Sequence, residues 1–140
     1  MNVADAPLYL DSTQPISARV AVLVGRMTTE EMLGQLLFNA PAIPRLGIPA
    51  YNWWGEALHG IARNGRATIF PQAIGMAATW DPDLIRRVAA AIADEGRAKY
   101  HATLRRYCET GHYQGLTFWS PNINIFRYPR WGRGQETWGE

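Results

Sequence analysis

The feature that most constrains the fold of this chain is one long helix between two short apolar segments. Asp81-Pro82 is a helix start signal, because aspartate caps the first free amides and proline fits the first helical position. Apolar residues then keep helical spacing to about residue 106. A short buried strand is predicted at residues 50–53, and a second strand is predicted at residues 116–120. Strand, helix and strand in this order favour an α/β fold with a parallel sheet and a right-handed crossover.

Shorter helices are predicted on the N-terminal side of this unit. Residues 1–14 lack a periodic pattern and are expected to form a loose leader. A helix is predicted from Pro15 to Gly25. Thr28 and Glu31 have the spacing of a capping box, which predicts a second helix that ends before Pro41. A short helical piece is expected over residues 72–78.

Composition argues against several classes of function. The chain has 140 residues, of which 47% are hydrophobic, and this is enough for one domain with a modest core. No run approaches the roughly 18 apolar residues of a membrane span, so no membrane partner is expected. The 14 basic and 12 acidic residues are mixed, and only Arg127, Arg130 and Arg133 lie close together, so nucleic-acid binding is not expected. The first residues lack the pattern of a signal peptide, and no compartment is indicated.

Metal ions and cofactors are not expected either. No two histidines have the four-residue spacing of a helical zinc site. The glycines around Arg133 are not followed by the Lys-Ser/Thr pair of a phosphate-binding loop.

Two stretches rich in tryptophan, glycine and charged side chains stand out as candidate sites. Residues 51–60 contain Trp53, Trp54 and Glu56, and residues 122–136 interleave arginine, tryptophan, glycine and glutamate. Sugars suit such surfaces, because their C–H faces pack on indole rings and their hydroxyls donate to carboxylates. Each stretch follows or closely trails the carboxyl end of a predicted strand, where parallel α/β folds bind ligands. The two stretches therefore predict one polar-aromatic pocket.

The residues alone leave several roles open. Glu56 and Glu136 are the obvious carboxylate pair for glycoside hydrolysis, which needs carboxyl groups about 5–5.5 Å apart for retention or about 6.5–9.5 Å for inversion. Glu56 is interpreted as a ligand contact, with capping of nearby amides as the alternative. Arg133 can donate in a fork to adjacent sugar hydroxyls, or it can form an ion pair with Glu136. Trp131 and Trp138 are either stacking platforms or loop packing.

The chain resembles the N-terminal domain of glycoside hydrolase family 3, the β-glucosidase and β-xylosidase family, from about Leu8 onward. The matching runs are GIPAYNWWGEALHG at 47–60, FPQAIGMAATWD at 70–81, SPNINIF at 120–126 and PRWGRGQET at 129–137. The WGEALHG form is closer to the β-xylosidase branch than to the glucosidases. The resemblance implies a (β/α)8-like (TIM-like) barrel, of which residues 15–140 form the first strands and helices only, since a whole barrel needs about 250 residues.

The resemblance also implies roles for particular residues in a retaining β-glycosidase that favours β-xylosides. Glu56 and Arg133 are expected to bind the non-reducing sugar, with Trp54 against it. The nucleophile, the acid/base and a Lys-His pair of sugar ligands fall after Glu140 in the family. The resemblance therefore replaces the pairing of Glu56 with Glu136 and implies no catalytic residue within this chain.

Two consequences of the resemblance are expectations about the chain itself. The 140 residues alone are expected to be inactive and to self-associate as an incomplete barrel, and a non-catalytic carbohydrate-binding or remnant fragment is the alternative. Tyr128 stands where the family commonly has aspartate, and loss of that carboxylate leaves Arg127 or Arg130 less well held.

Overall fold

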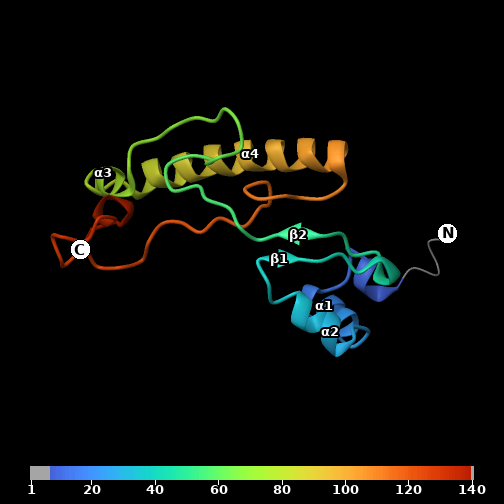
Figure 1. Ribbon diagram of the computed structural model, residues 1–140. Coiled ribbons are helices and arrows are strands. Elements are labelled where there is room, and N and C mark those ends of the chain that lie inside the picture. The colour runs from blue at the N-terminus through green and yellow to red at the C-terminus, as the bar shows by residue number, and fades with distance from the viewer. Residues whose placement is uncertain (1–6, 140) are drawn as a thin grey trace. The chain divides into compact units, whose positions relative to one another are not determined.

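The structure, a computed structural model, describes residues 7–139 and divides into two compact units, Met1–Leu37 and Phe38–Glu140 (Figure 1). Its helices are α1 (Ile16–Val24), α2 (Thr29–Gly34), α3 (Ala73–Ala77) and α4 (Pro82–Tyr107), and its strands are β1 (Asn39–Ala40) and β2 (Tyr51–Asn52). Short 3₁₀ helices form at Leu8–Leu10, at Pro44–Leu46 and at Gly134–Glu136, the last of which is η4.

The first unit confirms the two predicted N-terminal helices. Helix α1 ends at Gly25, and Thr28 and Glu31 form the complete capping box of α2. Helix α2 ends sooner than predicted, at Gly34, and the apolar residues that follow it, Leu36 and Leu37, are exposed.

The described part of the expected leader contains a short 3₁₀ helix. Residues 1–6 of the leader lie outside the described part of the chain. Leu8–Leu10 form a 3₁₀ helix, and Tyr9 is buried while its carbonyl accepts a hydrogen bond from Nε of Arg19 at 3.0 Å. The division of the chain into a leader and a barrel region stays a prediction.

Helix α4 confirms the strongest prediction of the sequence. Asp81 caps it by accepting a hydrogen bond from the amide of Leu84 at 2.9 Å, and the helix ends at Tyr107, one residue beyond the predicted end. Its inward face carries the buried Ile92, Gly96 and Thr103. These positions are four and seven residues apart, or about one and two helical turns, which places them along one side of the helix.

The core of the second unit lies between α4 and the loop that follows β2. Ile92 packs with the buried Ala57 and Ile61, and Phe70, Val88 and Phe118 pack around them. Figure 1 shows the loop running beside α4, and the segment after the helix doubling back along it. The carboxylate of Glu95 accepts hydrogen bonds from Thr68, and Nζ of Lys99 donates to the carbonyl of Asn64 at 2.7 Å. One face of α4 therefore holds this loop by both apolar packing and polar contacts.

The strand prediction is confirmed for one segment and wrong for the other. Among the described residues, β2 pairs only with β1, in an antiparallel two-stranded sheet, and residues 116–120 form no strand. The physical reason lies in the side chain of Tyr51. The amide of Leu116 donates to the hydroxyl of Tyr51 at 2.7 Å, so this amide is not available for a backbone ladder.

The segment 116–120 nevertheless lies beside β2 and the residues after it. A Cβ atom on Gly115 would come within 2.6 Å of the Asn52 carbonyl oxygen, and the amide of Trp119 donates to the carbonyl of Gly55 at 2.9 Å. These single contacts join the two segments, and the predicted parallel ladder between them is not formed among the described residues.

Candidate functional site

The backbone around Glu56 is held on both sides by long-range hydrogen bonds. The amide of Trp54 donates to the side chain of Asn52 at 3.0 Å, which turns the chain sharply at the end of β2. The amide of Tyr113 donates to the carbonyl of Trp54 at 2.8 Å. The carbonyl of Glu56 accepts from Ala62 at 3.0 Å. Glu56 is thus fixed at the carboxyl end of β2, where the sequence places it.

Asn52 organises this turn from a buried position. Only 5% of its surface is exposed, and its amide donates to the hydroxyl of Thr110 at 3.1 Å. Its side-chain nitrogen donates to Asn39 on β1 at 3.3 Å, while its oxygen accepts from Trp54. Buried polar groups need such partners, because an unpaired one costs about 1–3 kcal/mol. Asn52 is part of the matching run, but its role was not predicted.

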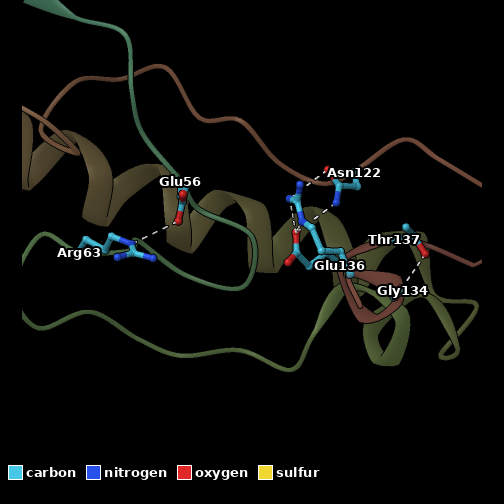
Figure 2. Close-up of polar contacts among 7 residues, drawn as sticks. Glu56, Arg63, Asn122, Gly134, Glu136 and Thr137 are labelled. Carbon is cyan, nitrogen blue, oxygen red and sulfur yellow. Dashed lines mark hydrogen bonds and ion pairs between the residues drawn. The ribbon is translucent and has the colours of Figure 1, made fainter. Parts of the chain in front are cut away.

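The carboxylate of Glu56 is partly exposed at the edge of a pocket of about 480 Å³. Its partner is Arg63, whose Nε lies 3.7 Å away in an exposed ion pair (Figure 2). The pocket continues along the loop past His59, whose ring donates from Nδ1 to the carbonyl of Phe70 at 2.8 Å. Among the described residues, the Glu56 carboxylate caps no backbone amide, so it keeps acceptor capacity for a ligand.

Trp54 lies in a cluster of aromatic rings. Its ring contacts Phe38 edge-on at 5.3 Å and Trp119 at a tilt with 4.9 Å between centroids. His112 stacks on Phe38 and meets Trp54 at 5.7 Å. The cluster fixes the indole without burying it, which leaves a rigid aromatic surface next to Glu56 in the sequence.

Arg133 is held in a three-residue network with Glu136 and Asn122. Its Nε donates to Oε2 of Glu136 at 2.8 Å, and its Nη2 donates to the same oxygen and to Oδ1 of Asn122. The Asn122 amide nitrogen donates to Oε2 of Glu136 at 3.1 Å, which closes the triangle (Figure 2). The ion pair that the sequence left as an alternative is therefore formed.

The network is built on η4. Gly134 lies so close to Phe126 that a Cβ atom would approach the ring to 2.5 Å. Thr137 is completely buried, and its hydroxyl donates to the Gly134 carbonyl at 2.8 Å (Figure 2). The short helix also packs against α3. These contacts hold Arg133 and Glu136 in fixed positions.

Arg133 and Glu136 shift each other's pKa. The hydrogen bond and charge of Arg133 lower the pKa of Glu136, so this carboxyl is ionised at neutral pH and is not suited to act as a general acid. The pKa of Arg133 is raised, first by Glu136 and to a smaller extent by the charge of Glu56. Glu56 and Arg133 are therefore close enough for their charges to interact, although they make no direct contact in the described structure.

Replacing Arg133 by glutamine is expected to raise the pKa of Glu136 toward its ordinary value of about 4.3, because the cationic donor is lost. Since folding lowers this pKa, the carboxylate stabilises the folded chain above its unfolded-state pKa, and this contribution is lost as the pH falls through the folded-state value. Carbon-detected NMR titration of the glutamate carboxyls measures the shift. An unchanged Glu136 pKa in the variant would show that Arg133 does not hold it.

Two residues of this region were not predicted from the sequence. Arg63 follows Glu56 by seven positions, and no pattern relates the two. Asn122 lies in a matching run, but its contact with Arg133 depends on how the chain folds back. Of the tryptophans left open, Trp131 has its ring centroid 6.2 Å from that of Phe126, and Trp138 lines a hollow together with residues of α4 while remaining exposed.

The described residues give no sign of a metal site or of a membrane segment. Within residues 7–139, no three histidine, cysteine, aspartate or glutamate side chains are grouped so that they can hold a metal ion. In the same range, no helix has the length and apolar character to cross a bilayer.

Comparison with known proteins identifies relatives of one kind. The Glycosyl hydrolase family 3 N terminal domain matches residues 24–140. Probable β-D-xylosidase 7 of Arabidopsis thaliana is 50% identical over 136 residues, which is 90% of this chain and 17% of that protein. β-D-xylosidase 1 of the same plant is 47% identical over 136 residues, or 90% of this chain and 16% of that protein.

A solved structure shows the same relationship in three dimensions. The family 3 exo-β-xylosidase XlnD, in complex with a xylobiose aziridine activity-based probe, superposes with a TM-score of 0.76 at 34% identity. The match covers 94% of this chain and 17% of that one, so the chain spans about a sixth of the length of its relatives. Because the family domain matches most of the sequence, the chain belongs to glycoside hydrolase family 3 and corresponds to part of its N-terminal domain.

Proposed function

We propose that this chain is the first part of a retaining β-glycosidase that removes terminal β-linked sugars, with β-xylosides favoured over β-glucosides. The observation that carries the proposal is the fold of the chain, which matches an exo-β-xylosidase over 94% of its length with a TM-score of 0.76. The relatives named β-D-xylosidase support the same substrate class. In the complete protein, residues 15–140 would contribute the first strands and helices of a (β/α)8-like barrel.

In this proposal Glu56, Arg133 and Trp54 bind the non-reducing sugar. Glu56 offers carboxylate oxygens to ring hydroxyls, and its exposed ion pair with Arg63 is weak enough to be displaced. Arg133 is oriented by Glu136 and Asn122, which leaves Nη1 without a partner among the described residues and available to a hydroxyl. Trp54 supplies an aromatic surface that the cluster around it holds rigid. Glu136 acts as a positioning residue here and not as a catalyst.

The isolated chain is expected to show no turnover of aryl β-xylosides or β-glucosides. Arg133 holds the pKa of Glu136 low, so this carboxyl is ionised and is not suited to protonate a leaving group. Many large apolar side chains are exposed, including Leu36 and Ile69, so self-association is expected as well. A glycosidase assay of the purified chain tests the first expectation, and light scattering tests the second. Turnover that Glu136→Gln abolishes would restore the local carboxylate pair as the catalysts.

The proposed function is tested directly by a chimera. Residues 7–139 of this chain replace the matching segment of Arabidopsis β-D-xylosidase 1, to which the chain is 47% identical. The chimera is expected to hydrolyse aryl β-xylosides and to prefer them to aryl β-glucosides. A folded chimera without activity would favour the alternative, a carbohydrate-binding or remnant segment that breaks no bond.

A further inference from the structure

A second hollow, separate from the pocket at Glu56, lies in the segment before η4. Its volume is about 400 Å³, and it is lined by Asn124, Ile125, Arg127, Tyr128, Arg130 and Trp131. None of these residues is among those expected to bind the non-reducing sugar. Two guanidinium groups and two aromatic rings thus share one small surface.

A tight turn presents these side chains. The amide of Trp131 donates to the carbonyl of Tyr128 at 3.0 Å, with Pro129 at the second position of the turn, where its fixed φ is favoured. Trp131 is half-buried, and its ring lies 6.2 Å from that of Phe126, which is itself in contact with Gly134. The aromatic wall of the hollow is therefore supported from behind by the turn that carries Arg133.

The two arginines of the hollow lack an acidic partner. The Arg130 guanidinium lies over the Tyr128 ring at 4.8 Å, and neither Arg127 nor Arg130 forms an ion pair within residues 7–139. In the sequence, Tyr128 stands between these two arginines, so an aromatic ring and no carboxylate lies between the two cationic side chains.

We propose that this hollow binds the carboxylate of an acidic sugar, a hexuronate, at a site distinct from that of the non-reducing sugar. Guanidinium groups donate in a planar fork that matches a carboxylate. The faces of Tyr128 and Trp131 suit the C–H face of a sugar ring, which a simple inorganic anion lacks. Within residues 7–139 neither arginine forms an ion pair, so both guanidinium groups can donate to a bound carboxylate.

The inference takes from the proposed function only that the ligand is a sugar. Its test measures binding to the 140-residue chain itself and needs no turnover, so failure of either idea leaves the other standing. Saturation-transfer NMR at low protein concentration follows sodium glucuronate, glucose and acetate. Phosphate has no protons to observe, so its binding is measured by its displacement of glucuronate. Glucuronate is expected to bind best, because glucose lacks the carboxylate and acetate and phosphate lack the ring.

Variants locate the site. Arg127→Gln and Arg130→Gln are each expected to weaken glucuronate binding by about tenfold. Tyr128→Asp is expected to do the same, because an internal carboxylate then occupies the arginines. Arg97→Gln removes the same charge from an exposed position on α4 and is expected to bind normally. Circular dichroism shows whether each variant retains its helices.

Three results would overturn the inference. The first is glucuronate binding that neither Arg127→Gln nor Arg130→Gln weakens. The second is a loss of binding in Arg97→Gln as large as in Arg130→Gln, which would indicate net charge alone. The third is phosphate binding as tight as that of glucuronate with the same dependence on Arg130, which would make the hollow a general anion site.

Discussion

Replacing Glu56 by alanine in the chimera is expected to lower kcat/KM on an aryl β-xyloside by about 100-fold, equivalent to about 3 kcal/mol of transition-state binding. The reason is that a carboxylate accepts charge-assisted hydrogen bonds from sugar hydroxyls, and alanine accepts none. Steady-state kinetics at several substrate concentrations measure the change. An unchanged kcat/KM would remove Glu56 from the sugar site.

Two control variants separate ligand binding from other effects. Arg63→Gln breaks the ion pair of Glu56, which is exposed and has its atoms 3.7 Å apart, so only a small effect is expected. Asp94→Asn removes a carboxylate from an exposed position on α4 and is expected to have no effect. If Arg63→Gln were as damaging as Glu56→Ala, the role of Glu56 would be to hold Arg63 in place.

Replacing Gly60 by alanine is expected to open the loop that follows Glu56, with a loss of at least about 3 kcal/mol in its local stability. Gly60 has a φ of 130°, which side chains rarely tolerate, and a Cβ atom would come within 2.1 Å of the Thr68 carbonyl oxygen. That oxygen belongs to the backbone, and Glu95 holds Thr68 on α4, so the contact cannot be relieved by a side-chain rotation.

Hydrogen exchange reports this opening. The amide of Phe70 donates to the carbonyl of His59 at 2.7 Å, so its exchange is expected to accelerate strongly in the Gly60 variant of the chimera. Gly47→Ala is the matched control, because Gly47 also has a positive φ, of 66°, but has nothing within 4 Å of the new Cβ atom. It is expected to cost only about 1 kcal/mol. Equal exchange at Phe70 in wild type and Gly60→Ala would show that the close approach is not rigid.

Local signals in the sequence predicted the helices well. The aspartate cap and the proline at the start of α4, and the capping box of α2, depend on side chains that lie within three residues of the amides they satisfy. Such signals are complete in the sequence itself. The ends of helices were harder to place, since Leu36 and Leu37 continue the apolar pattern of α2 but lie beyond its end.

The absence of a strand at residues 116–120 could not be predicted, because it depends on a contact across 65 residues. The hydroxyl of Tyr51 takes the amide of Leu116, and no local pattern reveals this. The same holds for the site. Its motifs indicated Glu56, Trp54 and Arg133, whose roles as sugar ligands stay a proposal. The choice between a free Arg133 and an ion pair required the position of Asn122, which lies 11 residues earlier in the chain.

Lys99 has a practical consequence for chemical labelling. It is the only lysine in the sequence, and its amine donates to the carbonyls of Asn64 and Arg66 in the loop that lines the pocket at Glu56. The amine of Lys99 must leave both carbonyls before an amine-directed reagent can modify it, because acylation requires the lone pair of a free amine. The reaction rate of this single side chain is therefore a direct readout of how often the loop leaves α4, with no engineered probe required.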